Sequence, residues 1–130
     1  MTTCGVWPRP RGLVAVLIDD AGHTRSVTVA PTDDARWGLA QRLAATGADL
    51  VIDVALLEAD SMASVALRAG VTVWIAGPPL VAALRCAAGV AHRGARPSAA
   101  LLARLPAIPW LRSQLRRLDS LEDDRQIKLL

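Results

Sequence analysis

The sequence predicts one α/β domain in which helices flank a mixed five-stranded sheet. Three observations lead to this class. Three apolar or alternating segments open the chain, helix and strand patterns alternate after them, and 130 residues is the usual size of a single domain. Hydrophobic residues make up 52% of the chain, which excludes a disordered protein, and without Phe or Tyr the core must be mainly aliphatic.

The first three segments have the patterns of β-strands. Residues 2–7 are mostly apolar and are followed by two prolines, which cannot continue a hydrogen-bonded ladder. Residues 13–19 form an aliphatic run that ends in an Asp-Ala-Gly turn, and residues 25–30 alternate between apolar and polar positions. The second and third strands are therefore expected to form a hairpin.

Helix and strand patterns alternate through the rest of the chain. The expected elements are a helix from 31 to 47, a strand over 49–53, a helix over 61–69, a strand over 71–75, and helices over 80–88, 99–105 and 110–118. The first helix has capping residues at its start and Gly47 at its end, and Ser98 can cap the helix that follows it. The order β β β α β α β α, with further helices after it, is that of the ribonuclease H-like fold. No glycine-rich phosphate loop indicates a nucleotide-binding fold instead.

The net charge of +3 is unevenly distributed along the chain. Residues 1–60 hold five arginines and eight acidic residues, and residues 119–130 hold four acidic residues and two basic ones. Residues 61–118 hold eight arginines and no acidic residue. Because arginine binds phosphate through two parallel hydrogen bonds, a polyanion is one expected partner of this segment. Ordinary arginines on exposed helix faces are the other interpretation.

The sequence indicates a soluble, cytoplasmic protein that does not enter a membrane. Its longest uncharged stretch is shorter than the roughly 20 apolar residues of a spanning helix, and the first residues lack the basic start and apolar run of a signal peptide. Cys4 and Cys86 have no spacing typical of a disulfide framework or a zinc site, so two unpaired thiols are expected.

Four short segments carry a resemblance to a known family. Cys-Gly-Val-Trp at residues 4–7 precedes Leu-Val-Ala-Val-Leu-Ile-Asp-Asp-Ala-Gly at 13–22. Leu-Val-Ile-Asp at 50–53 precedes Val-Ala-Leu-Arg-Ala-Gly-Val-Thr-Val at 65–73, and Arg-Gly-Ala-Arg-Pro-Ser-Ala-Ala-Leu-Leu-Ala-Arg occupies 93–104. Together these segments resemble the N-terminal RuvC-like domain of DEDD-type insertion-sequence transposases.

The resemblance implies a site at which four carboxylates hold two divalent metal ions. The matching positions hold Trp7, Asp53, Ala95 and Ser98, of which only Asp53 is acidic. One carboxylate cannot hold two Mg²⁺ ions against their hydration, so we predict that metal-dependent strand cleavage is lost and that no cofactor is bound. We also expect the chain to lack the family's second domain, which contributes a serine nucleophile, because 130 residues leave no room for it. The chain is therefore interpreted as a degenerate, transposase-derived relative from a mobile element.

The leading hypothesis is a catalytically inactive domain that binds nucleic acid, DNA in particular, through its arginine-rich half. The resemblance places Arg93 and Arg96 beside the former active-site edge, and Arg85 and Arg104 complete the predicted contact set.

A second hypothesis is a structural or interaction module. Residues 1–105 would form the ribonuclease H-like domain, and residues 106–130 a helical extension with a polar tail. An apolar stripe on the expected helix over 110–118 would associate with a partner or a second copy; it consists of Trp110, Leu111, Leu115 and Leu118.

A third hypothesis is a small phosphodiesterase with an improvised Mg²⁺ site. Asp53 would be joined by acidic residues that follow two of the strands, namely Asp19, Asp20, Glu58 and Asp60. His23 and His92 are interpreted as solvated loop residues, because neither has a serine or cysteine nucleophile at a recognisable spacing.

Overall fold

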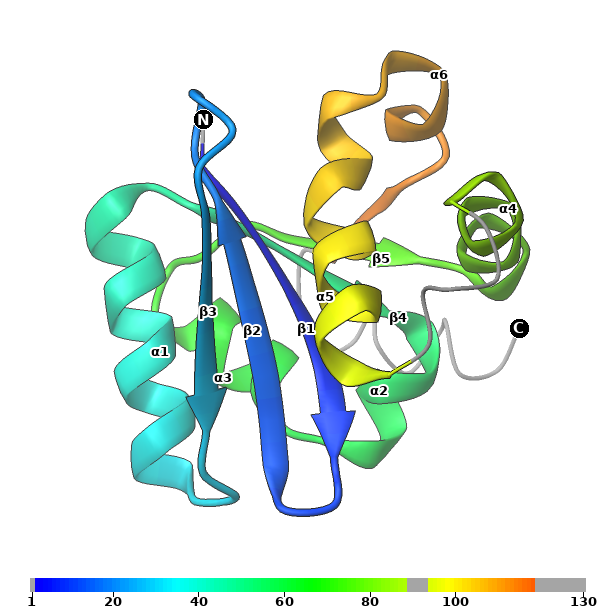
Figure 1. Cartoon of the computed structure of the whole chain (residues 1–130). Helices are drawn as coiled ribbons and strands as arrows, with labels where there is room; N and C mark the ends of the chain where they lie inside the picture. The colour runs from blue at the N-terminus through cyan, green and yellow to red at the C-terminus, as the bar shows by residue number, and fades with distance from the viewer. Residues whose placement is uncertain (1, 89–93, 119–130) are drawn as a thin grey trace.

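The computed structural model describes residues 2–88 and 94–118 and confirms the predicted class, with helices on both faces of one mixed sheet (Figure 1). Within these residues the sheet has six strands in the order β3-β2-β1-β4-β5-β6. Their bounds are β1 Thr3–Arg9, β2 Gly12–Ile18, β3 Thr24–Val29, β4 Asp49–Asp53, β5 Val73–Ala76 and β6 Arg116–Leu118. β1 and β4 are parallel, as are β4 and β5, whereas the β1–β2, β2–β3 and β5–β6 pairs are antiparallel.

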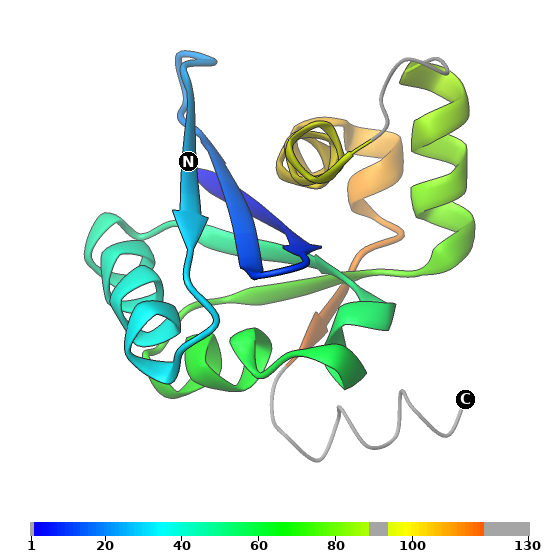
Figure 2. The same cartoon turned by 60° about the horizontal axis from the view of Figure 1, so that its bottom comes forward.

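The helices form two layers, one on each face of the sheet (Figure 2). Their bounds are α1 Asp33–Thr46, α2 Val54–Ala59, α3 Met62–Arg68, α4 Pro78–Ala88, α5 Ala95–Arg104 and α6 Pro109–Arg112, with a 3₁₀ turn η1 at Leu105–Ala107. Side chains from α1, α2 and α3 pack into the core on one face, and side chains from α4 and α5 pack on the other. None of these helices is long and apolar enough to cross a membrane.

Alternation along β1 determines which side chains face each layer. Cys4 and Val6 are buried in the core beneath α1 and α3. Thr3, Gly5 and Trp7 face α5, and the Thr3 hydroxyl donates a hydrogen bond to the Ala103 carbonyl of that helix. α5 therefore lies directly against β1.

Close contact between α5 and β1 requires a glycine at position 5. A Cβ atom there would overlap the Ala99 carbonyl oxygen and would lie 2.7 Å from the Ala103 nitrogen. Two backbones meet at this point, which explains a glycine inside a strand, where it is otherwise unfavourable. Gly5 therefore determines how deeply α5 sits on the sheet.

The helix predicted over 110–118 is wrong. α6 ends at Arg112, and residues 116–118 form β6, which pairs with the edge of β5. The unpaired backbone groups of β5 and burial of Leu118 favour this pairing over a helix whose pattern is only nine residues long. Leu115 and Leu118 are buried within the molecule, so the stripe proposed for self-association is not on one exposed helix.

Two further details differ from the sequence-based expectations. Ser98 does not cap its helix, because α5 begins at Ala95 with Gly94 as its N-cap, and the Ser98 hydroxyl donates to the Gly94 carbonyl at 2.7 Å. The short helix α2 was not expected. It begins after Asp53, whose carboxylate caps it by accepting a hydrogen bond from the Ala55 amide at 3.0 Å.

Candidate functional site

Two of the four positions implied by the transposase resemblance meet at one end of the sheet. Gly5 pairs with Val51 in the parallel β1–β4 ladder, and the continuing register places Trp7 level with Asp53. Both residues line a cavity of about 180 Å³, whose other lining residues are the apolar Val6, Pro8, Ala55 and Leu56. The carboxyl end of β4, where ligands commonly bind in such sheets, therefore presents an aromatic ring and one carboxylate.

The other two positions lie at the start of α5. Ser98 is buried, and the next residue, Ala99, belongs to a core cluster against which Trp7 packs. α5 thus brings its first turns to the same part of the sheet as Trp7. The side chain of Ala95 lies outside the described residues.

These residues do not fit the two divalent metal ions that the fold family implies. Trp7 packs against both core clusters beneath α5, so an apolar ring stands where the resemblance implies a carboxylate. The carboxylate of Asp53 caps α2, and the hydroxyl of Ser98 is bonded to the start of its own helix. Two-metal sites need several carboxylate oxygens directed at one point, and these side chains do not supply them.

Two members of the improvised metal site are not brought together by the fold. Asp19 follows Ile18, which pairs with Thr3, whereas Asp53 is level with Trp7, so the two aspartates lie toward opposite ends of the sheet. Across residues 2–88 and 94–118, no group of three or more His, Cys, Asp or Glu side chains could hold a metal ion. The side chain of Glu58 lies outside the described residues.

Asp60 has a structural role that explains its position after α2. Its carboxylate accepts hydrogen bonds from the Arg36 Nε at 3.0 Å and from the Arg36 Nη2 at 3.0 Å. It also accepts from the Met62 amide at 2.7 Å, where α3 begins. This partly buried ion pair joins α1 to the start of α3, so Asp60 stabilises the layer that covers the other face of the sheet.

A groove of about 250 Å³ lies between α5 and the hairpin strands β2 and β3. Among the described residues its lining consists of Val16, Thr24, Ser26, Arg96, Pro97, Ala100, Leu101 and Arg104, none of which is acidic. Arg96, Ala100 and Arg104 follow each other at intervals of four residues, so they form one stripe along the helix. Both arginines are exposed, and their backbone positions are about 12 Å apart along the helix axis.

Two of the four predicted contact arginines therefore line one groove. Arg93 lies outside the described residues, as does the side chain of Arg85 on α4. The sequence-based prediction missed Thr24 and Ser26 as members of the site. Ser26 belongs to the polar half of the alternating pattern in residues 25–30, which marks the face of β3 turned away from α1, and Thr24, two residues earlier, lies on the same face.

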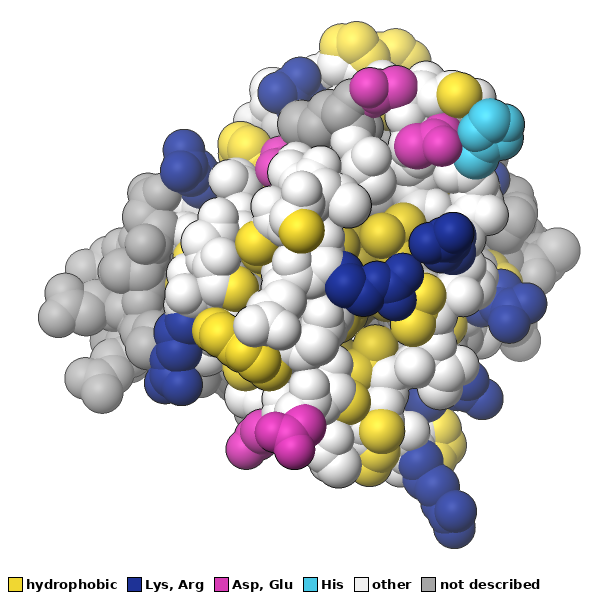
Figure 3. Space-filling view, turned by 90° about the vertical axis from the view of Figure 1, so that its left-hand side faces the viewer, with side chains coloured by type: hydrophobic (Ala, Val, Ile, Leu, Met, Phe, Trp, Pro, Cys, Tyr) yellow, Lys and Arg dark blue, Asp and Glu magenta, His cyan; other side chains and the backbone are white. Residues whose placement is uncertain are grey.

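The α1 side of the molecule differs from this groove in its charge. Figure 3 shows acidic side chains close to a histidine on this side, and basic side chains elsewhere on the same face. Charges of both signs therefore mix on this side. The described lining of the groove beside α5, by contrast, holds two arginines and no acidic residue.

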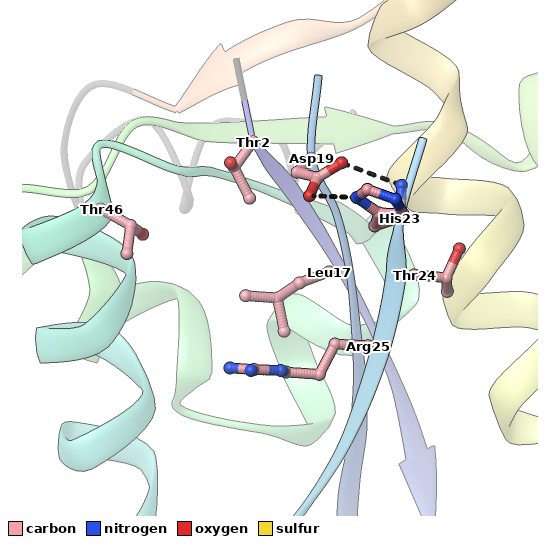
Figure 4. Close-up of a pocket in the computed structure, with 7 residues that line it drawn as sticks. All are labelled: Thr2, Leu17, Asp19, His23, Thr24, Arg25 and Thr46. Carbon is pink, nitrogen blue, oxygen red and sulfur yellow. Dashed lines mark hydrogen bonds and ion pairs between the residues drawn. The ribbon is translucent and has the colours of Figure 1, made fainter. Parts of the chain in front are cut away.

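A second pocket, of about 470 Å³, lies where the β2–β3 turn approaches the end of α1 (Figure 4). The Asp19 Oδ2 lies 3.2 Å from the Nδ1 of the exposed His23, and Oδ1 accepts from the amides of Ala21 and His23. The hydrogen bond from the His23 backbone amide is the main reason why the pKa of Asp19 is lowered, and the His23 side chain adds to it. These hydrogen bonds all lie within the β2–β3 turn, so the pair stabilises that turn.

The strand order, the parallel crossovers and the helix across β1 define a ribonuclease H-like α/β domain. Among solved structures the chain is similar to RuvC of Thermus thermophilus in complex with a Holliday junction substrate, with a TM-score of 0.59 and 17% sequence identity over 91% of this chain and 99% of that one. It is also similar to a second T. thermophilus RuvC structure, with a TM-score of 0.53 and 16% identity over 91% and 100% of the two chains. No family model and no curated protein matches the chain. At such low identity, the similarity establishes the fold.

Proposed function

We propose that this chain is a non-catalytic ribonuclease H-like domain, derived from a mobile-element transposase, that binds the phosphate backbone of nucleic acid. The observation that carries the proposal is the groove beside α5, whose lining combines Arg96 and Arg104 with the hydroxyl-bearing Thr24 and Ser26. Guanidinium groups and hydroxyls are the usual hydrogen-bond donors to phosphate oxygens. The described lining of the groove has no carboxylate that would repel a phosphate.

The spacing of the two arginines suits a polynucleotide. Their separation of about 12 Å along the helix corresponds to between three and four nucleotides at the 3.4 Å rise of one strand of B-form DNA. Arg96 and Arg104 can therefore each reach a different phosphate of the same strand. The surrounding segment, residues 61–118, has no acidic residue, so its field attracts a polyanion over a longer range.

The loss of strand cleavage is supported by the residues at the end of β1 and β4. An aromatic ring at Trp7 and a capping role for Asp53 leave too few oxygen ligands for two-metal phosphoryl transfer. The structurally similar RuvC was solved with a Holliday junction. That complex makes nucleic acid the natural ligand class to test for a chain with the same fold.

Binding is tested by fluorescence anisotropy with a labelled DNA oligonucleotide and the double variant Arg96→Glu, Arg104→Glu. We expect its affinity to fall about a hundredfold or more, because two charge-assisted contacts worth about 1.5–3 kcal/mol each are lost and replaced by repulsions. The matched control is Arg42→Glu, Arg68→Glu, which changes the net charge equally but on exposed arginines of α1 and α3. Equal loss in both variants, or no binding by the wild-type chain at low salt, would refute the proposed groove.

Catalysis is tested by incubating the chain with a labelled oligonucleotide and Mg²⁺ or Mn²⁺. We expect no cleavage above that of a buffer control. Metal-dependent cleavage that Asp53→Asn abolishes would contradict the non-catalytic part of the proposal and would favour the phosphodiesterase hypothesis.

A further inference from the structure

Trp110 is the most exposed large hydrophobic side chain of the described residues, with 73% of its surface accessible. It lies on α6, which follows the end of α5 after the short turn η1 (Figure 1). Arg104, which lines the groove, is the last residue of α5. The helix that carries the exposed ring therefore lies beyond the C-terminal end of α5, where the arginine stripe ends.

The turn that presents Trp110 is held in place by its neighbours. Ile108 and Leu111, on either side of it, pack against the core cluster beneath α4 and α5. Pro109 begins α6 with a fixed backbone angle, and the amides of Leu111 and Arg112 donate to the Ile108 carbonyl at 3.0 and 2.8 Å.

Side chains that follow α6 also bind the backbone of Trp110. The Ser113 hydroxyl and the Gln114 side-chain amide each donate a hydrogen bond to its carbonyl at 3.3 Å. Anchors on both sides and these capping contacts fix the backbone while the ring stays exposed. A ring presented in this way loses little conformational freedom when it binds a flat partner.

The charge of the segment that carries Trp110 favours a nucleic acid over an apolar protein surface as that partner. Arg104 and Arg112 are both exposed, and no acidic residue occurs between positions 61 and 118. Aromatic rings beside arginines are the combination that single-strand binding proteins use, since the ring stacks on a base and the guanidinium groups contact the backbone.

We propose that Trp110 is a stacking platform for an unpaired base and that the groove beside α5 therefore prefers single-stranded nucleic acid. This inference rests on the proposed function, because Arg96 and Arg104 must hold the strand that reaches α6. Base faces within a duplex are covered by their neighbours, so the ring can stack only where a base is unpaired.

The test compares a fluorescein-labelled oligothymidylate with a duplex of the same length by anisotropy, for the wild-type chain and for Trp110→Ala and Trp110→Phe. Base stacking is worth enough that Trp110→Ala should weaken binding to the single strand about tenfold, with less than a twofold effect on the duplex. Trp110→Phe, which keeps a ring, should restore most of the loss. Trp37→Ala, which removes the other exposed tryptophan, on α1, should bind like the wild type.

The outcomes separate this inference from the function on which it rests. If Trp110→Ala binds the single strand as well as the wild type does, or loses affinity for both probes equally, the stacking platform is refuted, while loss of binding in Arg96→Glu, Arg104→Glu still supports the groove. If the wild-type chain binds neither probe at low salt, both proposals fail. Matching circular dichroism spectra and urea midpoints would confirm that the Trp110 variants fold.

Discussion

Replacing Gly5 by alanine should destabilise the protein far more than a single methyl group usually does. The new Cβ would lie 2.7 Å from the Ala103 nitrogen and 2.9 Å from the Leu102 Cβ, well inside the 3.4 Å at which ordinary contact begins. It would also overlap the Ala99 carbonyl oxygen, which belongs to the backbone and cannot rotate away. Overpacking a core lowers the free energy of unfolding by about 1–3 kcal/mol. Because the new methyl group would meet a rigid helix backbone, we expect a loss of about 3 kcal/mol for Gly5→Ala.

Gly38→Ala is the matched control for this prediction. Gly38 lies inside α1, and a Cβ there would meet nothing within 4 Å. Alanine is more favourable than glycine in a helix by about 0.5–1 kcal/mol, so this variant should gain stability.

Urea denaturation followed by circular dichroism measures both effects. With an m-value of about 1–3 kcal/mol per molar urea, Gly5→Ala should lower the midpoint by roughly 1–3 M, whereas Gly38→Ala should raise it slightly. If Gly5→Ala unfolds at the wild-type midpoint, α5 does not lie against β1 as described, and the groove between α5 and the hairpin strands loses its structural basis.

Three other sites allow direct tests. Burial raises the pKa of Cys4 to about 12, so a thiol reagent at mildly alkaline pH should modify only the exposed Cys86 in the folded protein, and modification of both thiols would contradict the fold. NMR titration should give Asp19 a pKa below 3.8, and His23→Ala should keep most of that depression because the backbone amide is its main cause. Because this pKa is lowered, ionised Asp19 stabilises the fold at pH values above its unfolded pKa, and the contribution disappears as the pH falls through its folded pKa. An NMR titration midpoint for Asp19 at or above 3.8 would refute the lowered pKa. Asp60→Ala should lower the free energy of unfolding by about 2–3 kcal/mol, because it removes the two-pronged partner of the partly buried Arg36, which keeps only a 3.6 Å contact to the exposed Asp33, and because it removes a hydrogen bond at the start of α3. A loss below about 1 kcal/mol in urea denaturation would show that the ion pair contributes little.

The elements with strong local signals were predictable from sequence. The Thr32 hydroxyl accepts a hydrogen bond from the Ala35 amide at the start of α1, and Gly47 ends that helix in the left-handed region, as the capping residues indicated. The strand predicted over 49–53 is β4, because a short aliphatic run between a helix end and a turn has few alternatives.

The elements that were missed depend on tertiary contacts. Three residues of β6 carry no periodic pattern, and they form a strand only because β5 offers an unpaired edge. α2 is six residues long, too short for a helical pattern to be distinguished from a loop. Local propensity is a weak guide where neighbouring strands decide the conformation.

Only part of the candidate site was predictable from sequence, because the rest of it also depends on tertiary contacts. Arg96 and Arg104 were predicted from the charge pattern and the family resemblance, and helical spacing places them on one stripe. Thr24 and Ser26 joined them only through the sheet order, because some seventy residues separate β3 from α5 in the sequence. The exposure of Trp110 was not predictable either, because it depends on tertiary contacts. Leu115 and Leu118 of the expected apolar stripe are buried, whereas Trp110 is exposed.

The salt dependence of nucleic-acid binding tests the central claim most directly. Each phosphate contact adds about 0.9 to the slope of log Kobs against log salt concentration for a duplex, and about 0.7 for a single strand. The variant Arg96→Ala, Arg104→Ala should therefore give a line shallower than the wild type by about 1.4–1.8. Parallel lines for the two proteins would show that neither arginine contacts a phosphate, and would contradict the assignment of the groove beside α5 as the nucleic-acid interface.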